Sequence, residues 1–93
     1  MTFEAPDMER FPCLRMAIDA QKAGGVMPVA LNGANEEAVA AFLDERIPFG
    51  GIARTVETVL ARTENASVRE IGDVYEADRR ARFMARDVLR ALV

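Results

Sequence analysis

The sequence has no histidine and only one cysteine, Cys13, among its 93 residues. The lack of histidine removes the usual general base, the commonest metal ligand and every Ser-His or Cys-His nucleophile. A single cysteine cannot form an internal disulfide, which fits a reducing compartment. Without a histidine partner, Cys13 is interpreted as a packed thiol at the buried start of a helix, with a reactive thiol as the alternative.

Long apolar runs and an excess of positive charge are also missing. No segment is apolar enough to span a bilayer, and no basic start followed by an apolar run indicates a signal peptide. The net charge is -3, from 12 basic and 15 acidic residues. Nucleic-acid binding needs a concentrated basic surface, so we expect neither nucleic acid nor a membrane as a partner.

What remains is the pattern of a small helical domain, with 51% hydrophobic and 29% charged residues. Apolar residues recur at helical spacing, and no stretch shows the alternation of a strand. Pro12 suits the first turn of a helix, and Gly24-Gly25 ends it. We predict one all-α domain over residues 1–93, similar to a four-helix bundle, in which an extended arm over 1–11 precedes helices at about 12–23, 27–46, 51–62 and 73–91.

The second helix contains asparagine where an apolar stripe is expected. Asn caps helices well, and a buried amide without partners is costly. We therefore predict that helix 27–46 is broken near 32–35: one piece ends at Asn32-Gly33 and the next begins at Asn35. The asparagine side chains would then bond backbone groups left free at the break.

Paired acids are the first candidates for chemistry: Glu36-Glu37, Asp44-Glu45, and Asp73 with Glu76. Carboxylate pairs can hold a metal or transfer protons, but adjacent helical residues point about 100° apart. First-turn charge and solvated faces are the favoured interpretation. Asp73–Glu76 has a spacing related to the capping box, with Asp73 as cap of the last helix, and Ser67–Glu70 has the spacing for a single turn.

Arginines on the last helix are the second candidate. Arg82 and Arg86 share a face and could grip a phosphate or an acidic partner. Asp78 lies four residues before Arg82, so an ion pair within the helix is the favoured alternative. The pairs Gly24-Gly25 and Gly50-Gly51 lack the spacing of a nucleotide-binding loop and are interpreted as turns.

Nearly the whole chain, about residues 2–92, resembles a known family in the order of its motifs. These are "TFEAPDMERFPCLRMA", then "GG", "PVALNGANEEAVAAFL" and "IPFGGI". They resemble the C-terminal domain of 1-deoxy-D-xylulose-5-phosphate reductoisomerase. "RFPCL" and "LNGANE" carry most of the specificity. The family usually has Ala in place of Gly33, and an Asp near Gly50-Gly51 before the third helix.

The resemblance implies a parent enzyme with two further domains, one binding NADPH and one catalytic. That enzyme makes 2-C-methyl-D-erythritol 4-phosphate from 1-deoxy-D-xylulose 5-phosphate for isoprenoid biosynthesis, with NADPH and Mg or Mn. No residue here matches its catalytic, cofactor-binding or metal motifs, so we expect none of the three in this chain. This piece would support the catalytic domain of the same polypeptide without contributing chemistry.

The resemblance also sets expectations about assembly and location. The parent is expected to be a homodimer in the cytoplasm, or in a plastid for a plant-type source, and the isolated piece is expected to self-associate. Met1 stands where the family has another apolar residue, which suggests that the chain is cut from a longer one. Two alternatives stay open: a free-standing helical interaction module without enzymatic activity, and a small acidic metal-binding module.

Overall fold

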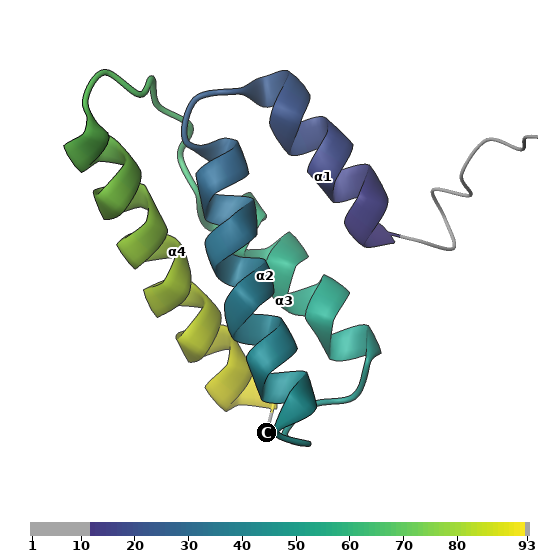
Figure 1. Ribbon diagram of the computed structural model, residues 1–93. Helices are drawn as coiled ribbons and strands as arrows, with labels where there is room; N and C mark the ends of the chain where they lie inside the picture. Colours follow the sequence, from purple (N-terminus) through teal and green to yellow (C-terminus); the bar gives the residue numbers. More distant parts are fainter. Residues whose placement is uncertain (1–11, 93) are drawn as a thin grey trace, which may run out of the picture.

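The computed structural model describes residues 12–92, in which every regular element is an α-helix (Figure 1). The helices are α1 (Pro12–Ala23), α2 (Met27–Leu43), α3 (Gly50–Arg62) and α4 (Ile71–Leu92). The all-α fold with four helices is therefore confirmed. The arm expected over residues 1–11 and the packing expected of the Cys13 side chain lie outside the described part.

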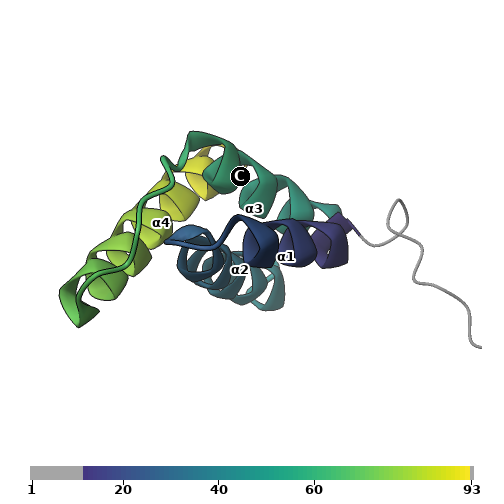
Figure 2. The same cartoon turned by 90° about the horizontal axis from the view of Figure 1, so that it is seen from above.

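Helix α2 occupies the centre of the fold. It packs against each of the other three helices, and α3 also packs against α4. Helix α1 contacts only α2 and α3 and does not reach α4. The view from above shows α4 and α1 on different sides of this arrangement (Figure 2). The fold is thus a three-helix core of α2, α3 and α4, with α1 added to one side.

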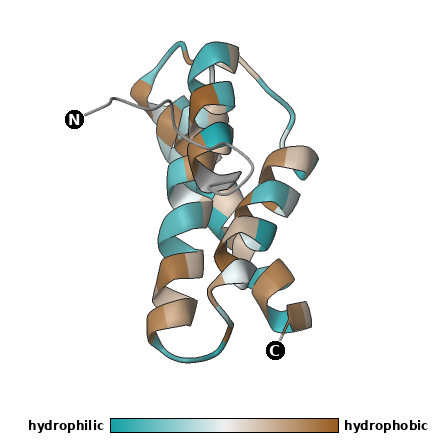
Figure 3. Cartoon of the chain, turned by 90° about the vertical axis from the view of Figure 1, so that its right-hand side faces the viewer, coloured by the Kyte–Doolittle hydropathy of each residue, from teal (hydrophilic) through white to brown (hydrophobic). Residues whose placement is uncertain are grey.

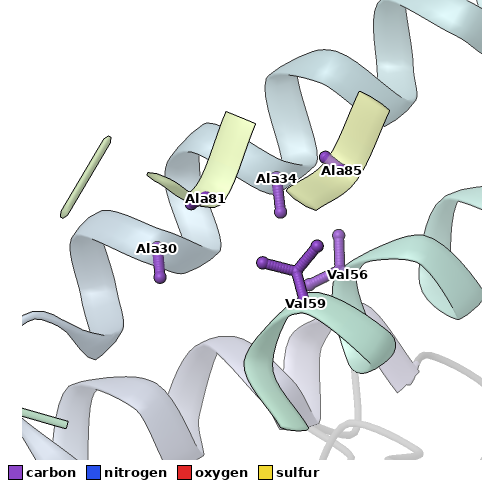
Figure 4. Close-up of a cluster of buried hydrophobic side chains, with 6 residues drawn as sticks. All are labelled: Ala30, Ala34, Val56, Val59, Ala81 and Ala85. Atoms are coloured by element: carbon purple, nitrogen blue, oxygen red, sulfur yellow. The ribbon is translucent and has the colours of Figure 1, made fainter. Parts of the chain in front are cut away.

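The core is built from small side chains. One cluster takes two residues from each core helix: Ala30, Ala34, Val56, Val59, Ala81 and Ala85 (Figure 4). A second cluster nearer the end of α2 contains Ala38, Ala41, Ile47, Ile52 and Leu89. Alanine lets helix axes approach closely, and each helix keeps hydrophilic residues as well (Figure 3). Close helix packing, rather than large side chains, therefore fills the interior.

The predicted break in the second helix is wrong, because α2 runs without interruption from Met27 to Leu43. Asn32 and Asn35 are exposed, and Asn32 Nδ2 donates to Glu36 Oε1 at 3.4 Å. Gly33 is buried. The asparagines therefore lie on the solvent-facing side of α2, and the other three helices cover its remaining sides. The helix also ends before residue 46, since Glu45 adopts a left-handed φ of 59°.

The start of the last helix also differs from the prediction. Helix α4 begins at Ile71, so Asp73 occupies its third position. From there Asp73 Oδ2 accepts the backbone N–H groups of Arg69 at 2.9 Å and Glu70 at 3.1 Å. Asp73 thus acts as the third helical residue of a capping box, whose carboxylate accepts backbone N–H groups before the helix, and it is not the N-cap residue itself. The single turn predicted from Ser67 is absent, since residues 63–69 are not helical.

The segment between α3 and α4 is bonded to the turn between α1 and α2. The Val26 N–H donates to Ala66 O at 3.0 Å and to Asn65 Oδ1 at 3.2 Å. Asn65 Nδ2 donates to Ala23 O at 3.3 Å. Gly25, with a φ of 58°, faces this contact so closely that a Cβ atom there would overlap Ala66 O. Glycine at this position therefore lets the two segments meet.

Candidate functional site

The charged residues singled out in the sequence come together between α2 and α4, which lie side by side (Figure 1). Arg82 Nη2 lies 2.7 Å from Glu36 Oε2, and Arg82 Nη1 lies 3.5 Å from Glu37 Oε1. Arg86 Nη2 lies 2.8 Å from the same Glu37 oxygen. On α4 itself, Arg82 Nε donates to both oxygens of Asp78, at 2.9 and 3.1 Å. We call these five residues the α2–α4 ion-pair network.

Local sequence explains one of the four ion pairs in this network. Asp78 and Arg82 are four residues apart, which places them on one helix face. Gly33 supplies the room on the facing helix, because an added Cβ there would lie 3.0 Å from Asp78 Oδ1 and 3.4 Å from Arg82 Cγ. A methyl group there would be tight against the Asp78 carboxylate, which is partly exposed and has room to shift.

The electrostatics of the network favour the charged forms of Glu37, Arg82 and Arg86. The hydrogen bond from Arg86 lowers the pKa of Glu37, and the same contact raises the pKa of Arg86. Hydrogen bonds to Asp78 and then Glu36 raise the pKa of Arg82 above its already high ordinary value. A general acid or base needs a pKa near the working pH. These shifts move away from that range and keep the three groups charged, as ion pairing between α2 and α4 requires.

The arrangement also bears on the metal and phosphate interpretations. The predicted Asp78–Arg82 pair is present, and Arg86, the second arginine proposed to grip a phosphate, already binds Glu37. Within residues 12–92, no group of three or more His, Cys, Asp or Glu side chains is arranged to hold a metal. The described residues therefore do not fit a metal site, and the carboxylates that converge do so on arginine.

The other two acidic pairs do not form a site. Asp44 pairs with Arg46 at 3.1 Å, whereas its neighbour Glu45 is exposed. Glu76 binds Arg80 at 2.9 Å and Arg79 at 3.2 Å, and its pKa is lowered chiefly by the hydrogen bond from Arg80. These are ion pairs on the surface, of the kind that contributes little to stability.

A groove lies between the segment that precedes α4 and α4 itself. Its charged lining residues are of both signs, two arginines and three acids: Arg62, Glu64, Asp73, Glu76 and Arg80. Such a lining gives no field of one sign that would attract a charged ligand. No helix in the described part of the chain is long and apolar enough to cross a membrane.

The pairs across the two helices were not visible in the sequence. Glu36–Arg82 and Glu37–Arg86 join residues that are 46 and 49 positions apart. No local spacing rule connects such distant residues. The only available signal was the four-residue spacing of Arg82 and Arg86 on one face, opposite adjacent acids on another helix.

Fold and network together define a small helical domain whose converging charges are paired internally. The chain belongs to the DXP reductoisomerase C-terminal domain family, whose model matches residues 1–84. The resemblance carried by "RFPCL" and "LNGANE" is therefore confirmed.

Relatives of the chain are much longer than it is. It is 52% identical, over 96% of its length, to the 1-deoxy-D-xylulose 5-phosphate reductoisomerase of Chlorobium limicola, and 56% identical, over 91%, to that of Burkholderia mallei. It covers 23% and 21% of these two proteins. Its fold matches the reductoisomerase of Zymomonas mobilis, solved in complex with NADPH, with a TM-score of 0.91 and 46% identity, over 99% of this chain and 24% of that one. The chain thus spans less than a quarter of the length of these relatives.

Proposed function

We propose that this chain works as the C-terminal domain of a 1-deoxy-D-xylulose 5-phosphate reductoisomerase. The complete polypeptide would use NADPH and a divalent metal, Mg or Mn, to convert that substrate into 2-C-methyl-D-erythritol 4-phosphate for isoprenoid biosynthesis. One observation carries the proposal: almost all of this chain superimposes on part of an NADPH-bound reductoisomerase, with a TM-score of 0.91.

Within that enzyme we assign the domain a supporting role. The carboxylates that converge between α2 and α4 are bound by arginine, and Glu37 has a lowered pKa. NADPH and the metal would bind parts of the polypeptide outside these 93 residues, because the described residues offer neither a metal ligand set nor the strand, glycine loop and helix of a dinucleotide site. The partner of the domain is the catalytic domain of the same polypeptide. The enzyme would be a cytoplasmic homodimer, or a plastid one in a plant-type source.

The test uses the complete polypeptide that contains this chain. NADPH oxidation is followed with 1-deoxy-D-xylulose 5-phosphate as substrate, first for the unaltered protein and then for the variants Glu37→Gln and Arg86→Gln. We expect activity from the unaltered protein, and kcat and KM close to its values in both variants once folding has been verified by circular dichroism.

Two results would overturn different parts of the proposal. Failure of the complete, folded polypeptide to turn over the substrate would refute the enzyme assignment. A large loss of kcat in a folded Glu37→Gln protein, with KM unchanged, would place a reacting group in this domain and refute the supporting role.

A further inference from the structure

Helix α1 buries little of its surface against the rest of the domain. Of its residues 14–23, only Ala20 is buried, and Ala20 is not among the buried residues of the two core clusters. Met16 packs against the first cluster but is only partly buried. The ion pair Arg15–Asp19, at 3.9 Å, lies within α1 and joins it to no other helix. Separation of α1 would therefore expose little apolar surface, and it costs less free energy than unfolding of the core.

An apolar groove remains between α1 and the two helices that it contacts. Its lining includes Met16, Ala20 and Ala23 from α1, Met27 from α2 and Leu60 from α3. In the first core cluster, by contrast, all six side chains are at most 1% exposed (Figure 4). Helix α1 thus packs less closely on the core than α2, α3 and α4 pack on one another.

The end of α1 is held by a single side chain, that of Asn65. Asn65 Nδ2 donates to the carbonyl oxygen of Ala23, the last residue of α1, at 3.3 Å. In the described part of the chain, this is the one hydrogen bond that joins α1 to a segment distant in sequence. Gly24 and Gly25 follow with left-handed φ values, and glycine changes conformation at low steric cost. The turn after α1 therefore has the properties of a hinge.

We propose that α1 separates from the domain as a unit, by rotation at Gly24 and Gly25, while α2, α3 and α4 stay packed. Asn65 holds the closed form. The open form exposes Met27 and Leu60, which α1 partly covers in the closed form. The core persists because none of the buried residues of its two clusters comes from α1. The proposal does not depend on the proposed function, since every residue that carries it lies in this chain.

The experiment is hydrogen exchange of the complete polypeptide that contains this chain, read by mass spectrometry of peptic fragments under native conditions. We expect the amides of residues 16–23 to be protected at least about tenfold less than those of residues 30–41 in α2. Asn65→Ala should speed exchange in α1 by about tenfold and leave fragments from α4 unchanged. The matched control is Asn32→Ala, which removes an exposed amide that bonds Glu36 within α2 and should leave α1 unchanged.

Three outcomes would overturn the proposal. Equal protection of α1 and α2 would show that the two helices open together. Fast exchange confined to residues 21–23 would mean fraying of one helix end, because separation of the whole helix must also expose the amides of Ala17 and Ile18. Equal effects of Asn65→Ala and Asn32→Ala on α1 would show that Asn65 does not hold the closed form. Reductoisomerase activity of the same preparation reports separately on the proposed function.

Discussion

Gly25 offers a quantitative test of how the two connecting segments are held together. Gly24 and Gly25 both have left-handed φ values, 66° and 58°. Alanine in that conformation costs about 1–2 kcal/mol at either position. A Cβ at Gly24 would meet nothing within 4 Å, whereas one at Gly25 would overlap the backbone oxygen of Ala66. Gly24→Ala is therefore the matched control for Gly25→Ala.

The extra cost at Gly25 follows from the bonds that must move. Relieving the overlap displaces the Ala66 carbonyl, which accepts the Val26 N–H at 3.0 Å, and the Asn65 side chain, which bonds Val26 and Ala23. Each hydrogen bond contributes about 0.5–1.5 kcal/mol net. We expect Gly24→Ala to lower the free energy of unfolding by about 1–2 kcal/mol and Gly25→Ala by about 3–5 kcal/mol.

The assay is urea unfolding of the two variants and the unaltered chain, followed by helical circular dichroism. Equal slopes against urea concentration would show that the midpoint shifts report stability rather than a changed unfolded state. Equal losses in the two variants would refute the reasoning, since they would mean that the contact between residues 25 and 66 adds nothing beyond backbone conformation.

Three further predictions concern the core and the network. Gly33→Ala should raise the free energy of unfolding by about 0.5–1 kcal/mol, because alanine has the higher helix propensity. The partly exposed Asp78 carboxylate can shift to admit the added methyl group. A lower melting temperature of the variant would show that the carboxylate cannot shift. Val59→Ala, at a fully buried position, should cost about 2–3 kcal/mol in urea unfolding, and a loss under about 1 kcal/mol would contradict the tight core. The pKa of Glu37 is lowered in the folded state, so its contribution to stability is present above its ordinary pKa of 4.5 and is lost as the pH falls through the lowered value. Glu37→Gln should therefore reduce the loss of unfolding free energy at acid pH. An unchanged loss in this variant would show that other groups cause it.

The helical class of the fold follows from the periodicity of apolar residues and from the residues that begin and end helices. Apolar spacing, the prolines at positions 12 and 28 and the glycine pair at positions 24 and 25 all carry local information, and local rules handle such features well. The same rules misplaced the start of the last helix. Asp73 can cap a helix or sit at its third position, and the four residues from Asp73 to Glu76 fit either register.

The error at α2 has a different cause. Capping preference is a property of the asparagine and its immediate neighbours, whereas exposure depends on which other helices cover α2. Asn32 and Asn35 occupy the uncovered side, where an amide meets water at no penalty. Gly33 occupies the side that meets α4. A local sequence window contains no information about that contact.

The ion-pair network shows the same limit. The pair within α4, Asp78–Arg82, was readable from its spacing, but the cross-helix pairs of Arg82 and Arg86 depend on α2 and α4 being neighbours. Sequence reasoning could name the acids and the arginines separately. Only the tertiary structure shows that they neutralise one another and so argues for a supporting role.

The most direct test of the central proposal is the size of the native polypeptide in source cells, by immunoblot with an antibody raised against this chain. Its own mass is 10.2 kDa, and the relatives it matches are more than four times as long. The proposal predicts one band at several times 10.2 kDa, as expected of a C-terminal domain within a reductoisomerase. A single band near 10.2 kDa would contradict it and would leave a free-standing helical module whose binding partner must be sought.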